Sequence, residues 1–557
     1  MRQAPFTAAD ILPLLAHRGP DDHGSHAGQH HLFGATRLAV IAPRTNQQPA
    51  VSADGNTVLV FNGELYNRSP LRCSLTSAGC SFRTQDTETE VLLHLLRRDG
   101  PAALARCNGI FALACWREDT GTCLLARDRC GTKPLYYTCR GGALFFASEL
   151  KALLRMLPGR PPLDLGTIGD YFTFGYIPSP ATPFAGIAKL PAGSWLSFRP
   201  GGQPHVQQYW DLDLTASEDP HTALPARAAL AAIPEAIRQE WCHSDGPVGI
   251  ALSGGLDSTA VLAQVSTIAC EPVRTYCLQF PVPSHDESGD AALAARHFHS
   301  RHTTVVPSAA DYLKALEQLF DSLDESFADP TFITLQLLAA RMSADVKVAL
   351  TGIGGDEVFA GYPTLTAHRY ASWYRRLPAV LRQRLFPALV GALPPGRTYF
   401  SFEFKARRFI RGSDDRSELQ HLRWMAYTTP DELQRLLHPV FAAAPLTAAE
   451  RQLSILLPAC RAGDLRNRIL YLDFKLFLEN NCLFQADRAG MSRRLEFRVP
   501  FLHHGFLDVI TRVPVAEKLR AGTKTLLRDL LGVQLPRRLR RKPKKGFGPP
   551  LAHWLQT

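Results

Sequence analysis

The chain has 557 residues and a mass of 61.5 kDa, a length that predicts more than one domain. Hydrophobic residues make up 45% of it and charged residues 20%, which excludes a mostly disordered chain. The formal net charge is +11, but the excess gathers near the carboxyl terminus without a nucleic-acid-binding motif, so we expect no nucleic-acid partner. No apolar run could span a bilayer, no signal peptide is visible, and the 12 cysteines form no CxxC pair. We therefore expect a cytoplasmic protein with reduced thiols and no membrane partner.

The first two hundred residues predict short strands with a few helices. Residues 57–61 form an apolar strand that runs into Asn62-Gly63, a turn dipeptide. Residues 111–116 and 123–126 flank a polar turn and predict a hairpin, and the apolar spacing of residues 90–97 predicts a helix. These elements predict a domain of α+β class over residues 1–205, followed by a polar linker over residues 206–224.

Strands and helices alternate in the rest of the chain, residues 225–557. An Ala-rich helix over 226–242, with a kink at Pro234, comes first. The elements that follow are strands at 248–252, 274–280 and 303–306 and helices at 258–268 and 287–299. This alternation predicts a parallel sheet covered on both faces, hence a second domain of α/β class. Residues 363–468 predict a helical, basic region.

The segment Ser253-Gly254-Gly255-Leu256-Asp257-Ser258 lies between a buried strand and a helix. Ligands of open parallel sheets bind at this edge, where glycine N–H groups and a helix N-terminus favour phosphate. Asp257 would need a magnesium ion to approach a phosphate. A Ser-capped helix after a tight turn is the alternative for a shorter motif.

A second glycine-acid turn, residues 349–357 (ALTGIGGDE), also ends a buried strand. Two such turns at strand ends can face one magnesium-bound ATP, and we expect them to lie together.

The two turns resemble those in the ATP-pyrophosphatase domain of glutamine-dependent asparagine synthetases, and the resemblance runs along nearly the whole chain. Its other segments are 17–22 (HRGPDD), 37–41 (RLAVI), 48–49, 62–67 (NGELYN), 127–129, 133–137 (KPLYY), 146–149 (FASE), 329–330, 487–491 (DRAGM), 496–502 (EFRVPFL) and 544–554. The resemblance implies an N-terminal Ntn-hydrolase-like αββα sandwich of class II amidotransferase type without its first strand. It also implies a C-terminal parallel-sheet domain of the adenine-nucleotide α-hydrolase type with added helices.

In that family ATP activates a side-chain carboxylate as an acyl-adenylate, pyrophosphate leaves, and ammonia attacks to give an amide. The resemblance therefore implies ATP and Mg²⁺ as cofactors, small-molecule substrates with aspartate the leading acid, and a homodimer. By motif position, Leu252, Leu278, Thr351 and Gly352 would hold the adenosine, and Ser253, Gly254, Gly255, Asp257 and Ser258 the pyrophosphate with magnesium. Asp356 would be a second magnesium contact, and Lys524 would neutralise the departing charge. A solvated helix lysine is the alternative for Lys524.

The amidotransferase half departs from the family at its start. Family members begin Met-Cys-Gly-Ile and use that cysteine as nucleophile, whereas this chain begins Met1-Arg2. Cys73 and Cys80 are the nearest cysteines, and an internal cysteine has no free α-amine to act as base. As written, the chain is expected not to hydrolyse glutamine; a misplaced start codon and a lost activity both fit.

The glutamine pocket of the family is nonetheless retained. Arg37 matches the residue that pairs with the α-carboxylate, and Asn62 and Gly63 match the oxyanion donors. Glu64 belongs to the same motif. Glu88 aligns best with the residue that binds the α-ammonium group, with Asp86 as the alternative.

Two departures concern the synthetase site. Ile353 stands where asparagine synthetases carry an acid, and isoleucine cannot transfer a proton. His503 replaces an aspartate and is expected to be a partly exposed loop histidine, with a catalytic role as the alternative. Three hypotheses remain open: a ligase acting on aspartate, a ligase of a specialised natural-product or polysaccharide pathway acting on another acid, and a non-catalytic ATP-binding relative.

Overall fold

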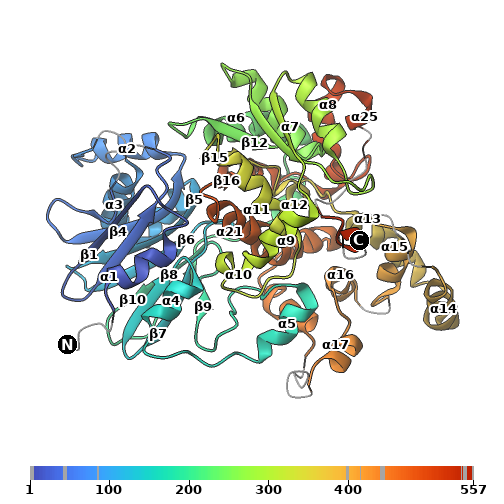
Figure 1. Ribbon diagram of the computed structural model, residues 1–557, viewed down its shortest axis with the longest axis horizontal. Helices are drawn as coiled ribbons and strands as arrows, with labels where there is room; N and C mark the ends of the chain where they lie inside the picture. Colours follow the sequence, from blue (N-terminus) through green and yellow to red (C-terminus); the bar gives the residue numbers. More distant parts are fainter. Residues whose placement is uncertain are drawn as a thin grey trace.

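The computed structural model describes residues 6–41, 47–84, 87–394, 396, 400–413, 416–438, 446–540, 542 and 548–554 (Figure 1). Asp86 and the 544–547 part of the last motif lie outside the described residues. In the described part of the chain, no helix combines the length and apolar character that crossing a membrane needs.

The first part of the chain is built on antiparallel sheets. Its largest sheet has six strands in the order β11-β10-β6-β5-β4-β3. The strands are β3 (Ala50–Val51), β4 (Thr57–Leu65), β5 (Gly109–Arg117), β6 (Thr122–Arg127), β10 (Ser194–Phe198) and β11 (His205–Gln208). The predicted hairpin is confirmed, because β5 and β6 pair antiparallel from Ala112 opposite Arg127 to Arg117 opposite Thr122.

This sheet is one of four stacked layers. The helices α2 (Arg68–Ser77) and α3 (Glu88–Asp99) pack on one face and share a core with β4 and β5. On the other face lie two small sheets, the hairpin β1 (Asp22–Ala27) and β2 (Leu32–Arg37) and the set β7 (Tyr136–Arg140), β8 (Ala143–Ala147) and β9 (Ala188–Lys189). The helices α1 (Ala8–Ile11) and α4 (Leu150–Met156) form the outermost layer. The helix predicted at 90–97 is confirmed as part of α3.

The turn predicted at Asn62-Gly63 is wrong. Strand β4 continues through both residues to Leu65 and pairs with β5 along its whole length. Gly63 has φ +144°, and a Cβ there would collide with the carbonyl oxygen of Ile110 on β5. The glycine therefore serves close strand pairing rather than a change of direction.

The second part of the chain contains a five-stranded sheet in the order β14-β13-β12-β15-β16, and all neighbours are parallel. Its strands are β12 (Val248–Ala251), β13 (Arg274–Leu278), β14 (Arg301–Val305), β15 (Val348–Leu350) and β16 (Glu496–Arg498). The alternation read from the sequence is confirmed, with α7 (Leu256–Ile268) after β12 and α8 (Ser288–His297) after β13. The strand order reverses between β12 and β15, and such a switch point is where open α/β sheets bind ligands.

Helices cover both faces of this sheet. Helix α6 (Ala226–Cys242) runs through Pro234 and shares a core with α7, while α11 (Thr331–Met342) and α21 (Phe484–Met491) share another with Tyr276 and Ala349. The other helices of this part are α9 (Ala309–Glu317), α10 (Leu319–Ser322), α12 (Gly355–Val358), α13 (Pro363–Tyr374), α14 (Phe386–Gly391), α15 (Phe402–Ile410), α16 (Ser417–Met425), α17 (Pro430–Leu436), α19 (Ala448–Leu456), α20 (Leu465–Leu472), α22 (His504–Ile510), α23 (Val515–Lys518), α24 (Thr525–Leu531), α25 (Arg537–Arg540) and α26 (Leu551–Trp554). Helix α5 (Gly166–Phe174) precedes them in the chain, and a π-helix spans Asp473–Leu483. The domain boundaries at 205 and 225 stay a prediction.

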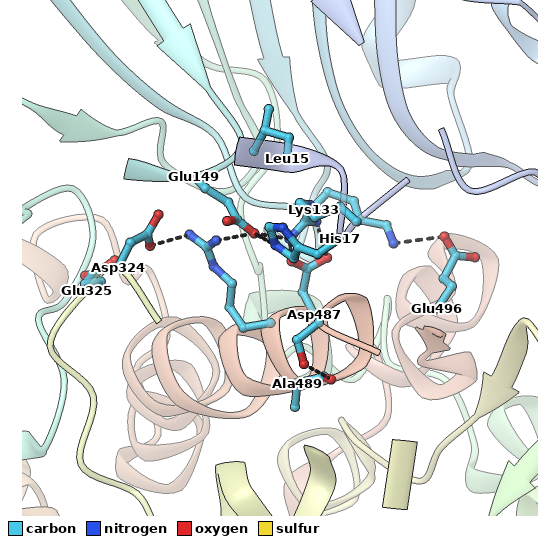
Figure 2. A network of polar contacts seen from close by, with 12 residues as sticks. Leu15, His17, Lys133, Glu149, Asp324, Glu325, Asp487, Ala489 and Glu496 are labelled. Carbon is cyan, nitrogen blue, oxygen red and sulfur yellow. Dashed lines mark hydrogen bonds and ion pairs between the residues drawn. The ribbon is translucent and has the colours of Figure 1, made fainter. Parts of the chain in front are cut away.

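A buried network of charges joins the two parts (Figure 2). Arg488 on α21 is fully buried and contacts Glu149 at 2.6 Å and Asp324 at 3.1 Å. Arg18 bridges Glu149 at 3.1 Å and Asp487 at 2.8 Å. Both arginines are fully buried against carboxylates, and these cations hold the pKa of Glu149 far below its usual range despite burial. The motifs at 17–22, 146–149 and 487–491 thus meet at the boundary between the two sheets.

Candidate functional site

The two glycine-acid turns lie against each other at the switch point. One follows β12 and the other follows β15, its direct neighbour in the sheet. A Cβ on Gly352 would lie 2.7 Å from both the Asp257 Cβ and the Ser258 nitrogen, and a Cβ on Gly355 would collide with the Asp257 carboxylate. The expected juxtaposition of the turns is confirmed, and it leaves no room for a side chain between them.

The first turn presents hydroxyl and N–H groups at the start of a long helix. Ser253 donates its N–H to the Ser258 hydroxyl at 3.2 Å, and Gly255 donates its N–H to the Ser253 hydroxyl at 3.3 Å. Helix α7 begins at Leu256 and has 13 residues, so its positive N-terminal end lies beside these groups. An anion at this turn would meet donors and a favourable dipole together.

Lys524 lies between the acids of the two turns. Its side chain is 6% exposed, its ammonium group contacts the Asp257 carboxylate, and it lies 2.7 Å from Asp356 Oδ1. Burial lowers the pKa of Lys524, but the two carboxylates outweigh this effect and raise it above its ordinary range. The alternative of a solvated helix lysine is therefore wrong.

Lys542 is a second cation of this site, and the sequence reasoning missed it as part of the basic tail. Its Nζ donates to the Gly254 carbonyl at 3.3 Å and pairs with Glu287 at 2.5 Å and Asp290 at 3.1 Å. The side chain is only 9% exposed. No local signal marks it, because residues 254 and 542 are brought together only by the tertiary fold.

The remaining synthetase residues lie around the turns. Leu252 directly follows β12 and Leu278 ends the neighbouring strand β13, and both side chains are buried in the core. Thr351 follows β15 and donates its hydroxyl to the Arg498 carbonyl at 3.0 Å. Ile353 packs partly buried between the two cores and presents no group that could transfer a proton.

His503 differs from its expectation as a partly exposed histidine. It is buried, 5% exposed, with Nε2 2.8 Å from Asn108 Nδ2 and 2.9 Å from Gln239 Oε1. Burial lowers the pKa of His503 to about 4, so the imidazole is neutral at pH 7. The expectation of partial exposure was wrong because Asn108, which lies in the first part of the chain, contacts His503 and covers this loop.

A cavity of about 1880 Å³ opens in the first part of the chain, and all five residues predicted for the glutamine pocket line it. They are Arg37, Asn62, Gly63, Glu64 and Glu88. Glu88 Oε1 accepts a hydrogen bond from the Leu65 N–H at 2.8 Å, and Arg37 Nη2 donates to the Ile41 carbonyl at 2.6 Å. Cys73 and Cys80 do not line the cavity.

A residue of the second part, His243, contacts two of the carboxylates that line this cavity but does not line it itself. Its Nε2 lies 2.6 Å from Glu88 Oε1 and 3.2 Å from Glu64 Oε2, and Arg498 Nη2 lies 3.4 Å from Glu64 Oε1. Burial and the neighbouring Glu88 raise the pKa of Glu64 to about 7. Burial lowers the pKa of His243, but the hydrogen bonds that it donates to the two carboxylates outweigh this effect and raise that pKa to about 9. His243 is therefore an imidazolium at pH 7, and the sequence reasoning did not single it out.

Comparison with known proteins matches each half of the chain to a family model. The family model for asparagine synthase matches residues 230–557, and that for the glutamine amidotransferase domain matches residues 2–210. Asparagine synthetase (glutamine-hydrolysing) 1 of Bacillus subtilis is 29% identical over 545 residues, which cover 98% of this chain and 84% of that protein. Asparagine synthetase (glutamine-hydrolysing) 3 of the same organism is 28% identical over 546 residues, 94% of this chain and 81% of that protein.

Among solved structures, an allosteric regulatory enzyme of purine biosynthesis covers 54% of this chain and 78% of its own at 15% identity. Its TM-score of 0.28 is too low to bear on the fold. The match of the asparagine synthase model to more than half of the chain is sufficient by itself. The chain belongs to the asparagine synthase family and carries an amino-terminal glutamine amidotransferase domain.

Proposed function

We propose that this protein is an ATP-dependent ligase that activates a carboxylate as an acyl-adenylate and converts it to an amide, releasing AMP and pyrophosphate. The observation that supports this most directly is the contact between the two glycine-acid turns around Lys524. The donors at the start of α7 suit the leaving pyrophosphate, and the buried ammonium group of Lys524 lies where negative charge would develop.

Two carboxylates from adjacent turns are the oxygen ligands that magnesium prefers, so Asp257 and Asp356 fit a magnesium ion. The ion would neutralise phosphate charge when bound. Ser253, Gly254, Gly255 and Ser258 would then hold the pyrophosphate by N–H and hydroxyl groups. Leu252 and Leu278, with Thr351 and Gly352, would contact the adenosine through backbone groups, since both leucine side chains are buried in the core.

Aspartate is the acid to test first, because both relatives described above are asparagine synthetases. One observation favours a second candidate, a ligase acting on another acid in a specialised pathway. Ile353 places an apolar side chain directly beside the turn at Gly352, where it can neither transfer a proton nor pair with a charged substrate group.

The cavity lined by Arg37 and Glu88 is proposed as an amide-binding pocket of an Ntn-hydrolase-like domain. Arg37 would pair with a ligand carboxylate, and Asn62 with the Gly63 N–H would face its amide group. Neither Cys73 nor Cys80 lines this pocket, and burial raises the pKa of Cys123, which does line it, far above its usual range. Because a thiol needs an adjacent base or a lowered pKa to act as a nucleophile, ammonia is the nitrogen source we propose.

Pyrophosphate release tests the ligase. Purified protein is incubated with ATP, magnesium and ammonium and with aspartate or a panel of other carboxylic acids. We expect release that depends on one acid, and at least a hundredfold loss in Asp257→Ala. The matched control is Asp431→Ala, which also removes an acid from the first turn of a helix, α17. Release with another acid only favours the second candidate; release with none, or full activity of Asp257→Ala, contradicts the proposal.

A further inference from the structure

We propose that the outer side of α13 is a docking surface for an acidic protein. The surface, called the α13 stripe below, consists of Arg369, Tyr370, Trp373, Arg376 and Leu377. The partner it fits presents a helix that carries apolar side chains and carboxylates together on one face. This inference goes beyond the ligase activity and does not depend on it.

The stripe belongs to a strongly basic segment of the chain. Residues 363–411 contain nine arginines and one lysine but a single acid, Glu403, so their formal charge is +9. This excess is larger than the +7 of residues 537–545 near the carboxyl terminus. Helices α14 and α15 of the same segment lie at the outer edge of the molecule (Figure 1). The segment therefore attracts anionic partners to this edge.

The same segment exposes an unusual number of apolar side chains. Nine of the 22 large hydrophobic residues that are exposed in the described part of the chain fall within residues 363–411. Trp373 is 53% exposed, and Phe402 at the start of α15 is 76% exposed. Exposed apolar groups gathered in this way, among charged groups, are typical of a surface that binds a partner.

Helix α13 has an inner side and an outer side. On the inner side Leu365, Ala371 and Tyr374 are buried, and the Tyr374 ring packs against Phe386 at 5.6 Å and Phe409 at 5.5 Å between centroids. Tyr374 thus holds α13 against α14 and α15. The outer side is fixed in orientation by this packing and is left facing solvent.

The α13 stripe mixes cations with apolar groups. Tyr370 and Trp373 lie 6.0 Å apart between ring centroids, and the Arg369 guanidinium lies 5.7 Å over the Trp373 ring. Arg376 and Leu377 continue the helical spacing, because their N–H groups still donate to the Trp373 and Tyr374 carbonyls at 3.0 and 3.1 Å. Neither Arg369 nor Arg376 forms an ion pair with another described residue.

This mixture favours an acidic protein over the other anionic partners. Guanidinium groups pair bidentately with carboxylates, and aromatic residues and arginine are enriched in protein interfaces. Helices that lie on membranes keep their cations on the side opposite the apolar one, whereas insertion of the α13 stripe would carry Arg369 and Arg376 into the acyl region. Nucleic-acid phosphates would satisfy the arginines but leave Leu377 without an apolar partner.

The stripe also lies on an element that leads away from the synthetase site. Helix α13 begins two residues after Gly361, where a Cβ would collide with both Asp356 and the Lys524 side chain. At a rise of 1.5 Å per residue, Trp373 lies about 15 Å along the helix from Pro363. A protein docked on the stripe is therefore held near the paired glycine-acid turns.

Fluorescence anisotropy of the full chain with labelled, 18-residue helical peptides tests the proposal. The probe carries leucine and glutamate together on one face. One control peptide has serine in place of its leucines, and the other has glutamine in place of its glutamates. We expect the wild type to bind the probe at least tenfold more tightly than either control peptide. Raising NaCl from 50 to 300 mM should weaken binding of the probe at least fivefold.

Two variants with matched controls locate the binding. Trp373→Ala and Arg369→Gln should each weaken binding of the probe at least fivefold. Their controls remove equally exposed groups elsewhere: Phe320→Ala on α10, where the ring is 84% exposed, and Arg461→Gln, where the side chain is 79% exposed. Both controls should bind the probe as the wild type does.

A wild type that does not prefer the probe over both control peptides overturns the proposal, and this measurement needs no variant to fold. Undiminished binding of the probe by Trp373→Ala overturns it as well. Sedimentation with phosphatidylglycerol vesicles that is lost in Trp373→Ala overturns it in favour of a lipid surface. Displacement of the probe by a DNA duplex that binds more tightly overturns it in favour of nucleic acid.

Discussion

Glu240 shows how a single buried residue links the fold to pH. It lies on α6 at 1% exposure, and burial raises the pKa of its carboxyl to about 8 even though Arg498 opposes the shift. The folded protein therefore binds this proton more tightly than the unfolded chain does. The stabilisation is fully present below the ordinary pKa of a glutamate, near 4.5, and is lost as the pH rises through 8.

Glu240→Gln is expected to remove this loss, because an amide cannot ionise. Between pH 5 and pH 9 the free energy of unfolding of the wild type should fall by about 4 kcal/mol more than that of the variant. Urea unfolding at the two pH values measures it, with the exposed Glu317→Gln as control. Equal pH dependence of wild type and Glu240→Gln would show that the carboxyl is not buried as described.

For single residues, the sequence predicts membership of a site better when the residue lies within a motif than when only the fold brings it to the site. Asp257, Asp356 and Lys524 were predicted for one site, and the structure places them in contact. Lys542 and His243 were missed because their partners lie 288 and 155 positions away in the chain. His503 was predicted as partly exposed because nothing local reveals that Asn108 covers it.

Among the elements, the two turns after β12 and β15 decide the geometry of the nucleotide site. The alternation of strands and helices around these turns could be predicted from the sequence, since buried apolar strands and Ala-rich helices have distinct patterns. The Asn62-Gly63 turn was predicted wrongly because the same dipeptide also permits the close approach of β5 to β4. A glycine in a sequence thus indicates either close packing or an unusual backbone angle. Only the position of the partner strand shows which of the two applies.

Gly355→Ala tests the contact between the turns. The new Cβ would collide with the Asp257 carboxylate, a movable side-chain end, so the fold should persist while the carboxylate shifts. We expect pyrophosphate release to fall about ten- to a hundredfold, in line with misplaced catalytic groups, with little change in Tm. The control Gly246→Ala lies in the same half of the chain, and a Cβ there meets nothing within 4 Å. Equal activity of the two variants would contradict the proposed placement.

For the molecule as a whole, the buried network around Arg488 fixes the two parts relative to each other. Burying a charge is costly, and each of the two arginines there pairs with one carboxylate of its own part and one of the opposite part (Figure 2). The sequence motifs at 17–22 and 487–491 could be listed in advance, but their role in joining the parts follows only from the tertiary arrangement.

Arg488→Met is expected to lower the free energy of unfolding by about 3–5 kcal/mol, because it leaves Glu149 and Asp324 without their shared cation. Arg520→Met is the control: its ion pair with Asp529 is 2.7 Å long but 60% exposed on the arginine side, so its removal should cost less than about 1 kcal/mol. Urea unfolding compares the two. Similar losses in both variants would mean that the network does not join the two parts.

The central claim is that the carboxyl oxygen of the acid attacks the α-phosphorus of ATP at the paired turns. Mass spectrometry of AMP formed from an acid labelled with ¹⁸O in its carboxylate tests this directly, with ammonium as the nitrogen source. We expect one ¹⁸O atom in the AMP phosphate of the wild type and no labelled AMP from Asp257→Ala. Unlabelled AMP, or ADP with labelled inorganic phosphate, would contradict acyl-adenylate formation at this site.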